Sequence, residues 1–268
     1  MRLLEMKSAG EFSLIQVATH NTLSYAILSH TWTDGREVTY QDLISGASNS
    51  KSSYDKIKFC GEQANRDGLQ YFWVDTCCID KSNAVELATA INSMFRWYRN
   101  ATKCYVYLAD VSTPGHDTDV QAKQSTWEAA FRDSRWFTRG WTLQELIAPA
   151  VVEFFSKERK LLGSKRSLEK LIHRITKIPI QALRGNPFSD FSIAERKGWV
   201  AQRQTTEEED IVYCLLGLCE VSMLPIYGEG KGAAVKRLQI TAREFSKESS
   251  ELKDSEGVYS IFNVTCRY

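Results

Sequence analysis

The sequence lacks the motifs by which nucleotide-binding and zinc-binding enzymes are usually recognised. No GxGxxG follows the first apolar run, which argues against a classical dinucleotide-binding fold. The glycine-rich stretch YGEGKG at residues 227–232 is no phosphate-binding loop, because no glycine stands five residues before Gly230 and Lys231 precedes a glycine. It is more typical of a turn. The histidines and cysteines show no metal-ligand spacing, so we expect no metal site.

Other absences restrict the class of protein. The 34 Lys and Arg residues nearly balance the 33 Asp and Glu residues, so nothing favours nucleic acid as a partner. No apolar run approaches the roughly 18 residues of a membrane span. The amino-terminal MRLLEMK has neither the apolar core nor the cleavage site of a secretory signal. The seven cysteines include no CxxC pair, which is typical of reduced, buried thiols in a cytoplasmic protein.

The pattern that is present is an alternation of strands and helices within 268 residues, enough for one large domain or two small ones. Short apolar runs predict strands at residues 25–30, 71–75, 104–110 and 151–155. Helical spacing lies between them, at residues 53–66, 83–100 and 135–147. This order predicts an α/β fold with a parallel sheet between helices. Further helices are predicted at 167–176, 192–202, 207–219 and 232–245, followed by a charged and then β-like segment from residue 247.

Polar side chains follow the first three predicted strands. They are Ser29, His30, Thr31 and Trp32, then Asp75, Thr76 and Cys77, then Asp110. In parallel sheets ligands bind beyond the carboxyl ends of the strands, so we expect these groups to gather along one edge. A Cys77 or Cys78 thiolate beside His30 would be an activated nucleophile, although a cysteine at a strand end is more often part of the core.

One carboxylate, Glu145, stands out in the stretch RWFTRGWTLQELI at residues 135–147. If this stretch is one helix, Glu145 shares a face with Trp141, and the pair suits a cationic or sugar-like ligand. A carboxylate there would stabilise the oxocarbenium-like transition state of glycosidic cleavage, while Trp141 or Trp32 stacks on a base or a pyridinium ring. Alternatively, Thr142 and Glu145 have the spacing of a capping box, and Glu145 only stabilises a helix start.

Three blocks in order resemble the HET (heterokaryon incompatibility) domain family of filamentous fungi. They are YAILSHTW at 25–32, WVDTCCID at 73–80 and RGWTLQE at 139–145, supported by TTEEED at 205–210 and IYGEGK at 226–231. The resemblance implies a HET domain over residues 1–245, with a TIR-like (flavodoxin-like) core at about 20–160 and a helical extension at about 161–245. Residues 246–268 would be a C-terminal segment or a linker to a following domain.

The same resemblance implies a cytoplasmic role in allorecognition, innate immunity and regulated cell death. Many TIR domains cleave NAD with a glutamate in a Trp-Cys-x-x-Glu-Leu motif, and WTLQEL at residues 141–146 is similar, with threonine in place of cysteine. This favours an NAD glycohydrolase with Glu145 as the catalytic residue and NAD as substrate, without a cofactor. The substrate-binding residues would be Ser29, His30, Thr31, Trp32, Asp75, Cys77, Arg139 and Trp141.

The implied partners are a second copy of the chain on activation and a fused or separate nucleotide-binding switch protein. A different class of function is also open, namely a non-catalytic module that self-associates and triggers death by recruiting partners. Glu145 would then be a helix cap, and the tryptophans would belong to the core or to an interface.

Overall fold

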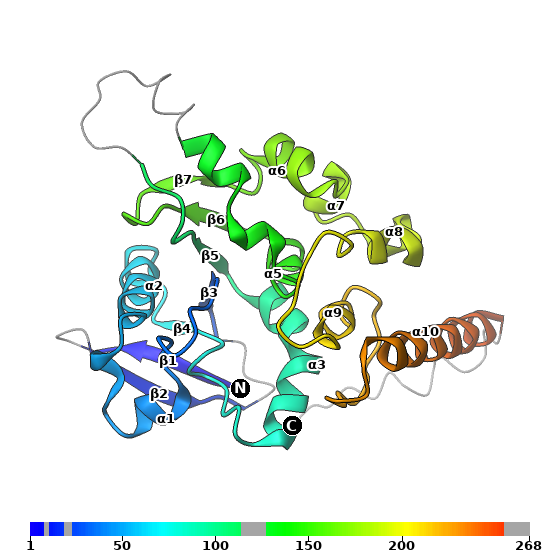
Figure 1. Ribbon diagram of the computed structural model, residues 1–268, viewed down its shortest axis with the longest axis horizontal. Helices are drawn as coiled ribbons and strands as arrows, with labels where there is room; N and C mark the ends of the chain where they lie inside the picture. Colours follow the sequence, from blue (N-terminus) through cyan, green and yellow to red (C-terminus); the bar gives the residue numbers. More distant parts are fainter. Residues whose placement is uncertain (8–10, 19–22, 114–126, 255–268) are drawn as a thin grey trace.

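A seven-stranded sheet with the order β2-β1-β4-β3-β5-β6-β7 forms the centre of the protein. The computed structural model describes residues 1–7, 11–18, 23–113 and 127–254. The strands are β1 (Arg2–Met6), β2 (Phe12–Gln16), β3 (Tyr25–His30), β4 (Tyr71–Trp73), β5 (Lys103–Tyr107), β6 (Val152–Phe155) and β7 (Leu161–Ser164). The sheet with helices on both sides confirms the predicted α/β class (Figure 1).

The four central strands are those predicted from the sequence, and they are parallel. β3 pairs with β4 on one side and with β5 on the other, and β5 pairs with β6. Every residue of β3 is buried, as expected for a strand covered on both faces. The order of these four strands is consistent with a flavodoxin-like or TIR-like arrangement. The antiparallel strands β1, β2 and β7 at the two edges were not predicted.

Helices cover both faces of the sheet. α2 (Tyr54–Arg66) packs on one face, while α3 (Ala84–Asn100) and α5 (Thr142–Ile147) cover the other (Figure 1). α3 begins where predicted, because the Asn83 side chain accepts from the backbone N–H groups of Val85 and Glu86. A short helix, α1 (Tyr40–Ile44), lies between β3 and α2 and starts with a capping box from Thr39 and Asp42.

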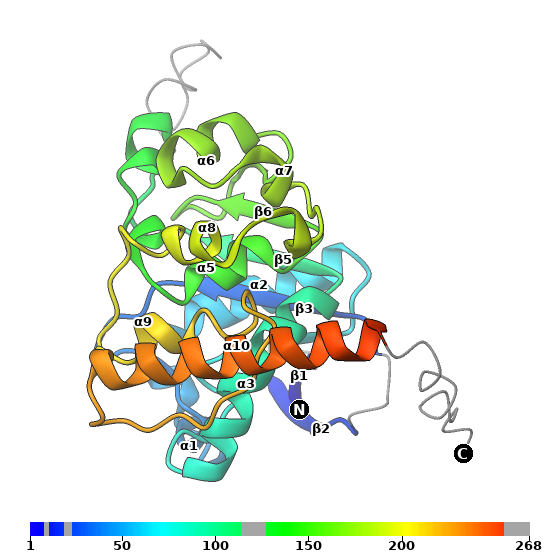
Figure 2. The same ribbon diagram turned by 90° about the vertical axis from the view of Figure 1, so that its right-hand side faces the viewer.

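The extension packs outside α3 and α5, with α10 as the outermost helix (Figure 2). Its helices are α6 (Glu169–Thr176), α7 (Ile180–Leu183), α8 (Ile193–Gly198), α9 (Asp210–Tyr213) and α10 (Lys231–Asp254). The predicted capping box of Ser192 and Glu195 is confirmed at the start of α8. Among the described residues, no helix combines the length and apolar character that a membrane crossing requires.

The prediction of one helix over residues 135–147 is wrong. A 3-10 turn, η2 (Arg135–Thr138), is followed by extended backbone at Arg139, and α5 begins only at Thr142. The break arises because the chain at residues 138–140 pairs with Gln204 of the extension. The Gln204 N–H donates to Thr138 O at 2.6 Å, and the Gly140 N–H donates to Gln204 O at 2.9 Å. Long-range pairing therefore overrides the local helical pattern.

Three predictions in the extension are also wrong. The predicted helix over residues 207–219 shrinks to α9, and Glu209 forms no capping box with Thr206. The Glu209 carboxylate instead accepts from the N–H groups of Gly228 and Gly230, at 2.8 and 2.9 Å, and fixes the glycine-rich turn. At the end of the chain, α10 continues to Asp254, beyond the predicted helix end at residue 245 and into the segment predicted to be charged and then β-like. Residues 255–268 lie outside the described part.

Candidate functional site

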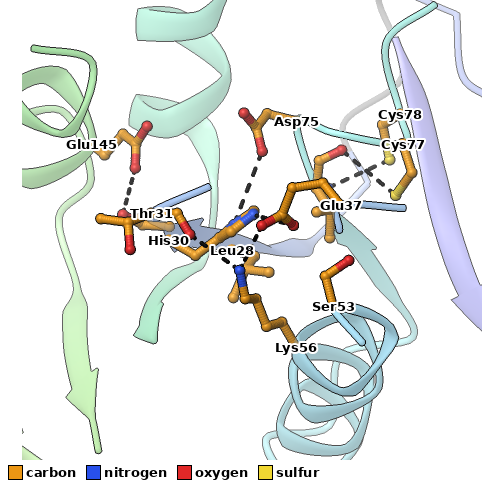
Figure 3. A network of polar contacts seen from close by, with 12 residues as sticks. Leu28, His30, Thr31, Glu37, Ser53, Lys56, Asp75, Cys77, Cys78 and Glu145 are labelled. Carbon is orange, nitrogen blue, oxygen red and sulfur yellow. Dashed lines mark hydrogen bonds and ion pairs between the residues drawn. The ribbon is translucent and has the colours of Figure 1, made fainter. Parts of the chain in front are cut away.

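The polar groups at the carboxyl ends of β3 and β4 gather at one edge of the sheet, as the parallel topology predicts (Figure 3). Ser29 and His30 are the last residues of β3, and Asp75 follows β4 by two residues. The His30 Nδ1 and Asp75 Oδ1 atoms are 4.0 Å apart. Glu145 reaches the same edge from α5, so four residues from three distant segments of the sequence form one cluster of polar side chains.

The Glu145 carboxyl group is buried, with 5% of the residue exposed. It accepts a hydrogen bond from the Ser29 hydroxyl, and the Trp136 indole N–H donates to Ser29 Oγ at 2.7 Å. The alternative prediction of a capping box at Thr142 is wrong. The Thr142 hydroxyl donates to the carbonyl oxygens of Trp136 and Arg139, and Trp141 occupies the N-cap position of α5.

The surroundings of Glu145 favour its neutral form. Burial, and secondly the negative charge of Asp75, raise the pKa of Glu145 to about 8 from an ordinary value of 4.5. Hydrogen bonds from Ser29 and Tyr98 and the charge of Arg203 oppose this shift without cancelling it. Glu145 is therefore mostly protonated at neutral pH in this conformation, and it would need to lose a proton to carry negative charge.

A second polar network lies beside Glu145 and ends at α2. His30 Nε2 lies 3.3 Å from Glu37 Oε2, and Lys56 Nζ lies 2.7 Å from Glu37 Oε1 (Figure 3). Burial alone would raise the pKa of Glu37, but the contacts with His30 and Lys56 outweigh it and lower the value to about 2. Lys56 also donates to Thr31 O at 3.1 Å. Glu37 is therefore ionised at neutral pH and carries a negative charge at this edge.

A pocket of about 370 Å³ opens next to this network. Its lining comes from the loop after β3, the start of α1, Lys51 and the loop between β4 and α3. It includes Trp32, Glu37, Thr76 and Lys81. His30 adjoins the pocket because it contacts the lining residue Glu37, and Asp75 adjoins it because it precedes the lining residue Thr76 in sequence. The Glu145 carboxyl does not line the pocket, so a ligand held there would meet Glu145 only after a local rearrangement.

The remaining predicted site residues lie in three different surroundings. Cys77 is fully buried, and burial raises the pKa of its thiol, the opposite of an activated nucleophile. The Arg139 guanidinium donates to Thr206 Oγ1 at 3.0 Å. The Trp141 indole N–H donates to Asp210 Oδ2 at 2.9 Å, and neither Arg139 nor Trp141 lines the pocket. In the described part of the chain, no cluster of His, Cys, Asp and Glu is arranged to hold a metal ion.

Several residues of the site were not predicted from the sequence. Glu37 and Lys56 belong to polar segments without a motif, and only the fold brings them to His30. Arg203 is buried in the extension, where it donates to Thr142 Oγ1 at 2.8 Å and interacts with Glu145. Asp210 carried a signal, since it ends the TTEEED motif, but its position against Trp141 depends on the extension folding back over α5.

Comparisons with known proteins identify the family. The family model described as "Heterokaryon incompatibility protein (HET)" matches residues 25–120. The vegetative incompatibility protein HET-E-1 of Podospora anserina is 56% identical over 241 residues, which cover 89% of this chain. The chain spans only 18% of the length of that relative. No solved structure gives a significant match. With the three sequence blocks placed on one α/β domain, the chain belongs to the heterokaryon incompatibility (HET) family.

Proposed function

We propose that this chain is a cell-death effector domain of vegetative incompatibility, and that it cleaves NAD to nicotinamide and ADP-ribose. Membership of the HET family and the relative HET-E-1 support the biological role. The observation that carries the proposed chemistry is the position of Glu145. It is a buried carboxyl group at the carboxyl ends of the parallel strands, hydrogen-bonded to Ser29, and Trp32, which follows the same strand end, lines a pocket.

The reaction breaks the bond between the ribose C1 carbon and the pyridinium nitrogen of NAD. The bonding electron pair leaves with nicotinamide, which becomes neutral, and positive charge develops on the ribose. An ionised Glu145 would stabilise that charge. Water then adds to the ribose carbon and releases a proton, so the products are ADP-ribose, nicotinamide and one proton.

The conformation described here corresponds to a resting state under this proposal. Glu145 is buried and its pKa of about 8 keeps it protonated at neutral pH. An active state requires Glu145 to open toward the pocket, where contact with water would return its pKa toward the ordinary value. Self-association on activation, driven by a fused nucleotide-binding switch, would supply that rearrangement. The small share of HET-E-1 that this chain spans supports the presence of further domains in such proteins.

Each predicted binding residue has a role in this scheme. Trp32, which lines the pocket, and Trp141, which does not, would frame the nicotinamide end of NAD. Ser29, His30 and Asp75 would orient the ribose or a phosphate. Thr31, directly after the end of β3, would contribute to binding the same part of NAD. Arg139 would reach a phosphate only by leaving Thr206. Cys77 would shape the site from within the core.

One observation favours a second function of a different class. The Glu145 carboxyl is closed off by Ser29 and the surrounding core, as a purely structural group would be. On this alternative the domain is a non-catalytic module that self-associates and triggers death by recruiting partners.

An assay of nicotinamide release separates the two functions. Wild type, Glu145→Gln and the exposed control Glu244→Gln are incubated with NAD over a series of protein concentrations, and the same variants are expressed in cells. Catalysis predicts release that rises more than linearly with wild-type concentration, and a loss of about 100-fold or more in Glu145→Gln alone. If wild type kills cells yet releases no nicotinamide, and Glu145→Gln kills equally well, the recruiting module is correct.

A further inference from the structure

Lys81 occupies an aromatic surface inside the pocket. Its Nζ atom lies 3.5 Å from the centroid of the Trp32 ring, and both side chains line the pocket. Trp32 is otherwise accessible, with 44% of the residue exposed. The loop that carries Lys81 is held in place because Asp80 Oδ1 accepts from the Ser82 N–H at 3.1 Å. The ammonium group is thus placed over the indole by the fold of its loop.

Three acidic residues act on Lys81. Asp75, Glu37 and Asp210 all interact electrostatically with it, yet in the described part of the chain it forms no ion pair with any of them. The other lysine of the pocket lining, Lys51, is already paired with Asp42 at 2.7 Å. Lys81 is therefore the lining lysine whose charge remains available, and its direct partner is an aromatic face.

We propose that the Trp32 face is a binding site for a planar organic cation, and that the Lys81 ammonium occupies this site in the resting domain. An indole face attracts cations through its quadrupole and requires no hydrogen bond from them, so a flat aromatic cation fits it at least as well as an ammonium. The nearby carboxylates add a field that favours any positive charge at this position. Binding of the ligand displaces Lys81 toward solvent, which its flexible stem permits.

The identity of the cation rests on the proposed function, under which it is the pyridinium ring of NAD. The site itself does not depend on that function, because it follows from Trp32, Lys81 and the surrounding carboxylates. The opposite role for Lys81 would be to bind the phosphates of a nucleotide. The two roles predict opposite effects of removing the lysine, so they are separable.

Binding of 1-methylnicotinamide tests the proposal. This pyridinium ion carries a methyl group in place of the ribose of NAD, so it has no glycosidic bond to cleave. Its affinity is measured by calorimetry or by chemical shifts for wild type, Lys81→Ala, Lys81→Arg and the exposed control Lys160→Ala. Lys81→Ala is expected to bind the probe about fivefold more tightly, since the competing ammonium is gone. Lys81→Arg and Lys160→Ala are expected to bind like wild type. Adding Trp32→Ala to Lys81→Ala is expected to abolish the gain.

Unchanged or weaker binding of the probe by Lys81→Ala overturns the proposal. A Lys81→Ala variant that loses affinity for ADP-ribose, which has no pyridinium, and gains none for 1-methylnicotinamide would identify Lys81 as a phosphate ligand instead. Because the probe is not a substrate, its binding is measured independently of catalysis. Tighter binding by Lys81→Ala, together with no nicotinamide release from NAD by wild type at any protein concentration, would support the cation site and reject only the proposed function.

Discussion

The buried carboxyl of Glu145 couples the stability of the domain to pH. Its pKa is about 8 in the folded protein and near 4.5 in an unfolded chain, so between these values the folded state keeps a proton that the unfolded state loses. The contribution of this group to stability is therefore fully present below about pH 4.5 and is lost as pH rises toward 8.

The variant Glu145→Gln isolates this contribution. The glutamine amide stays neutral at every pH and can still accept a hydrogen bond from Ser29. The free energy of unfolding of this variant therefore does not fall with rising pH on account of residue 145. We expect the free energy of unfolding of wild type, relative to that of Glu145→Gln, to fall by up to about 1.4 kcal/mol per pH unit in the pH window between about 4.5 and 8. Urea unfolding at a series of pH values measures it. A difference between the two proteins that is independent of pH would show that Glu145 is ionised in the folded state.

Asp75 provides a second prediction at the scale of single residues. Its negative charge is, after burial, the second cause of the raised pKa of Glu145. Asp75→Asn should lower that pKa and move the upper end of the pH window down, while Asp133→Asn, on the surface, should leave it in place. The same unfolding series reads out the position of the window. An unchanged window in Asp75→Asn would mean that burial alone sets the pKa.

Sequence reasoning located the carboxyl ends of β3 and β4 correctly but not the contacts made there. Ser29, His30 and Asp75 could be placed together because parallel strands end at the same edge. The partner of Glu145 could not be predicted, since Ser29 lies 116 residues away in sequence and only the packing of α5 joins them. The same holds for Glu37 and Lys56, which no spacing connects to His30.

At the scale of elements, the close approach of two chain segments requires a glycine at position 140, between Arg139 and Trp141 in the third sequence block. The chain at residues 203–205 crosses so close to it that a Cβ atom would lie 2.5 Å from Thr205 Cγ2 and 3.7 Å from Gln204 O. The glycine therefore permits the pairing that separates η2 from α5. A prediction based on helical periodicity failed here because it describes one segment, whereas the break is imposed by another.

Gly140→Ala should destabilise the protein by roughly 1–3 kcal/mol, because the added methyl group overlaps a packed neighbour. Thr205→Ser removes the methyl group that it would strike and should restore a large part of the loss when the two changes are combined. Thermal or urea unfolding of the two single variants and the double variant measures the coupling. Purely additive effects would place the strain elsewhere than at this contact.

At the scale of the whole molecule, the sheet and the extension depend on each other. Gly217 of the extension packs so tightly on α3 that a Cβ atom would lie 2.2 Å from Phe95 Cβ, and Arg203 donates to the carbonyl of Arg139 at 2.9 Å. The sequence predicted both halves as runs of strands and helices, because local periodicity is sufficient for that. Their mutual burial could not be predicted, since it depends on long-range contacts without a motif.

A chain that ends at residue 166 should therefore fail to fold cooperatively, although it retains every strand of the sheet. Truncation exposes the faces of α3 and α5 that the extension covers, and it removes Arg203 from Thr142 and Glu145. We expect a broad thermal transition and binding of a hydrophobic dye, while a control chain that ends at residue 246 keeps a sharp transition. Calorimetry with near-UV circular dichroism measures both. A sharp transition with a native near-UV spectrum in the 1–166 chain would mean that the sheet with its own helices is an independent folding unit, and that the extension joins it after folding.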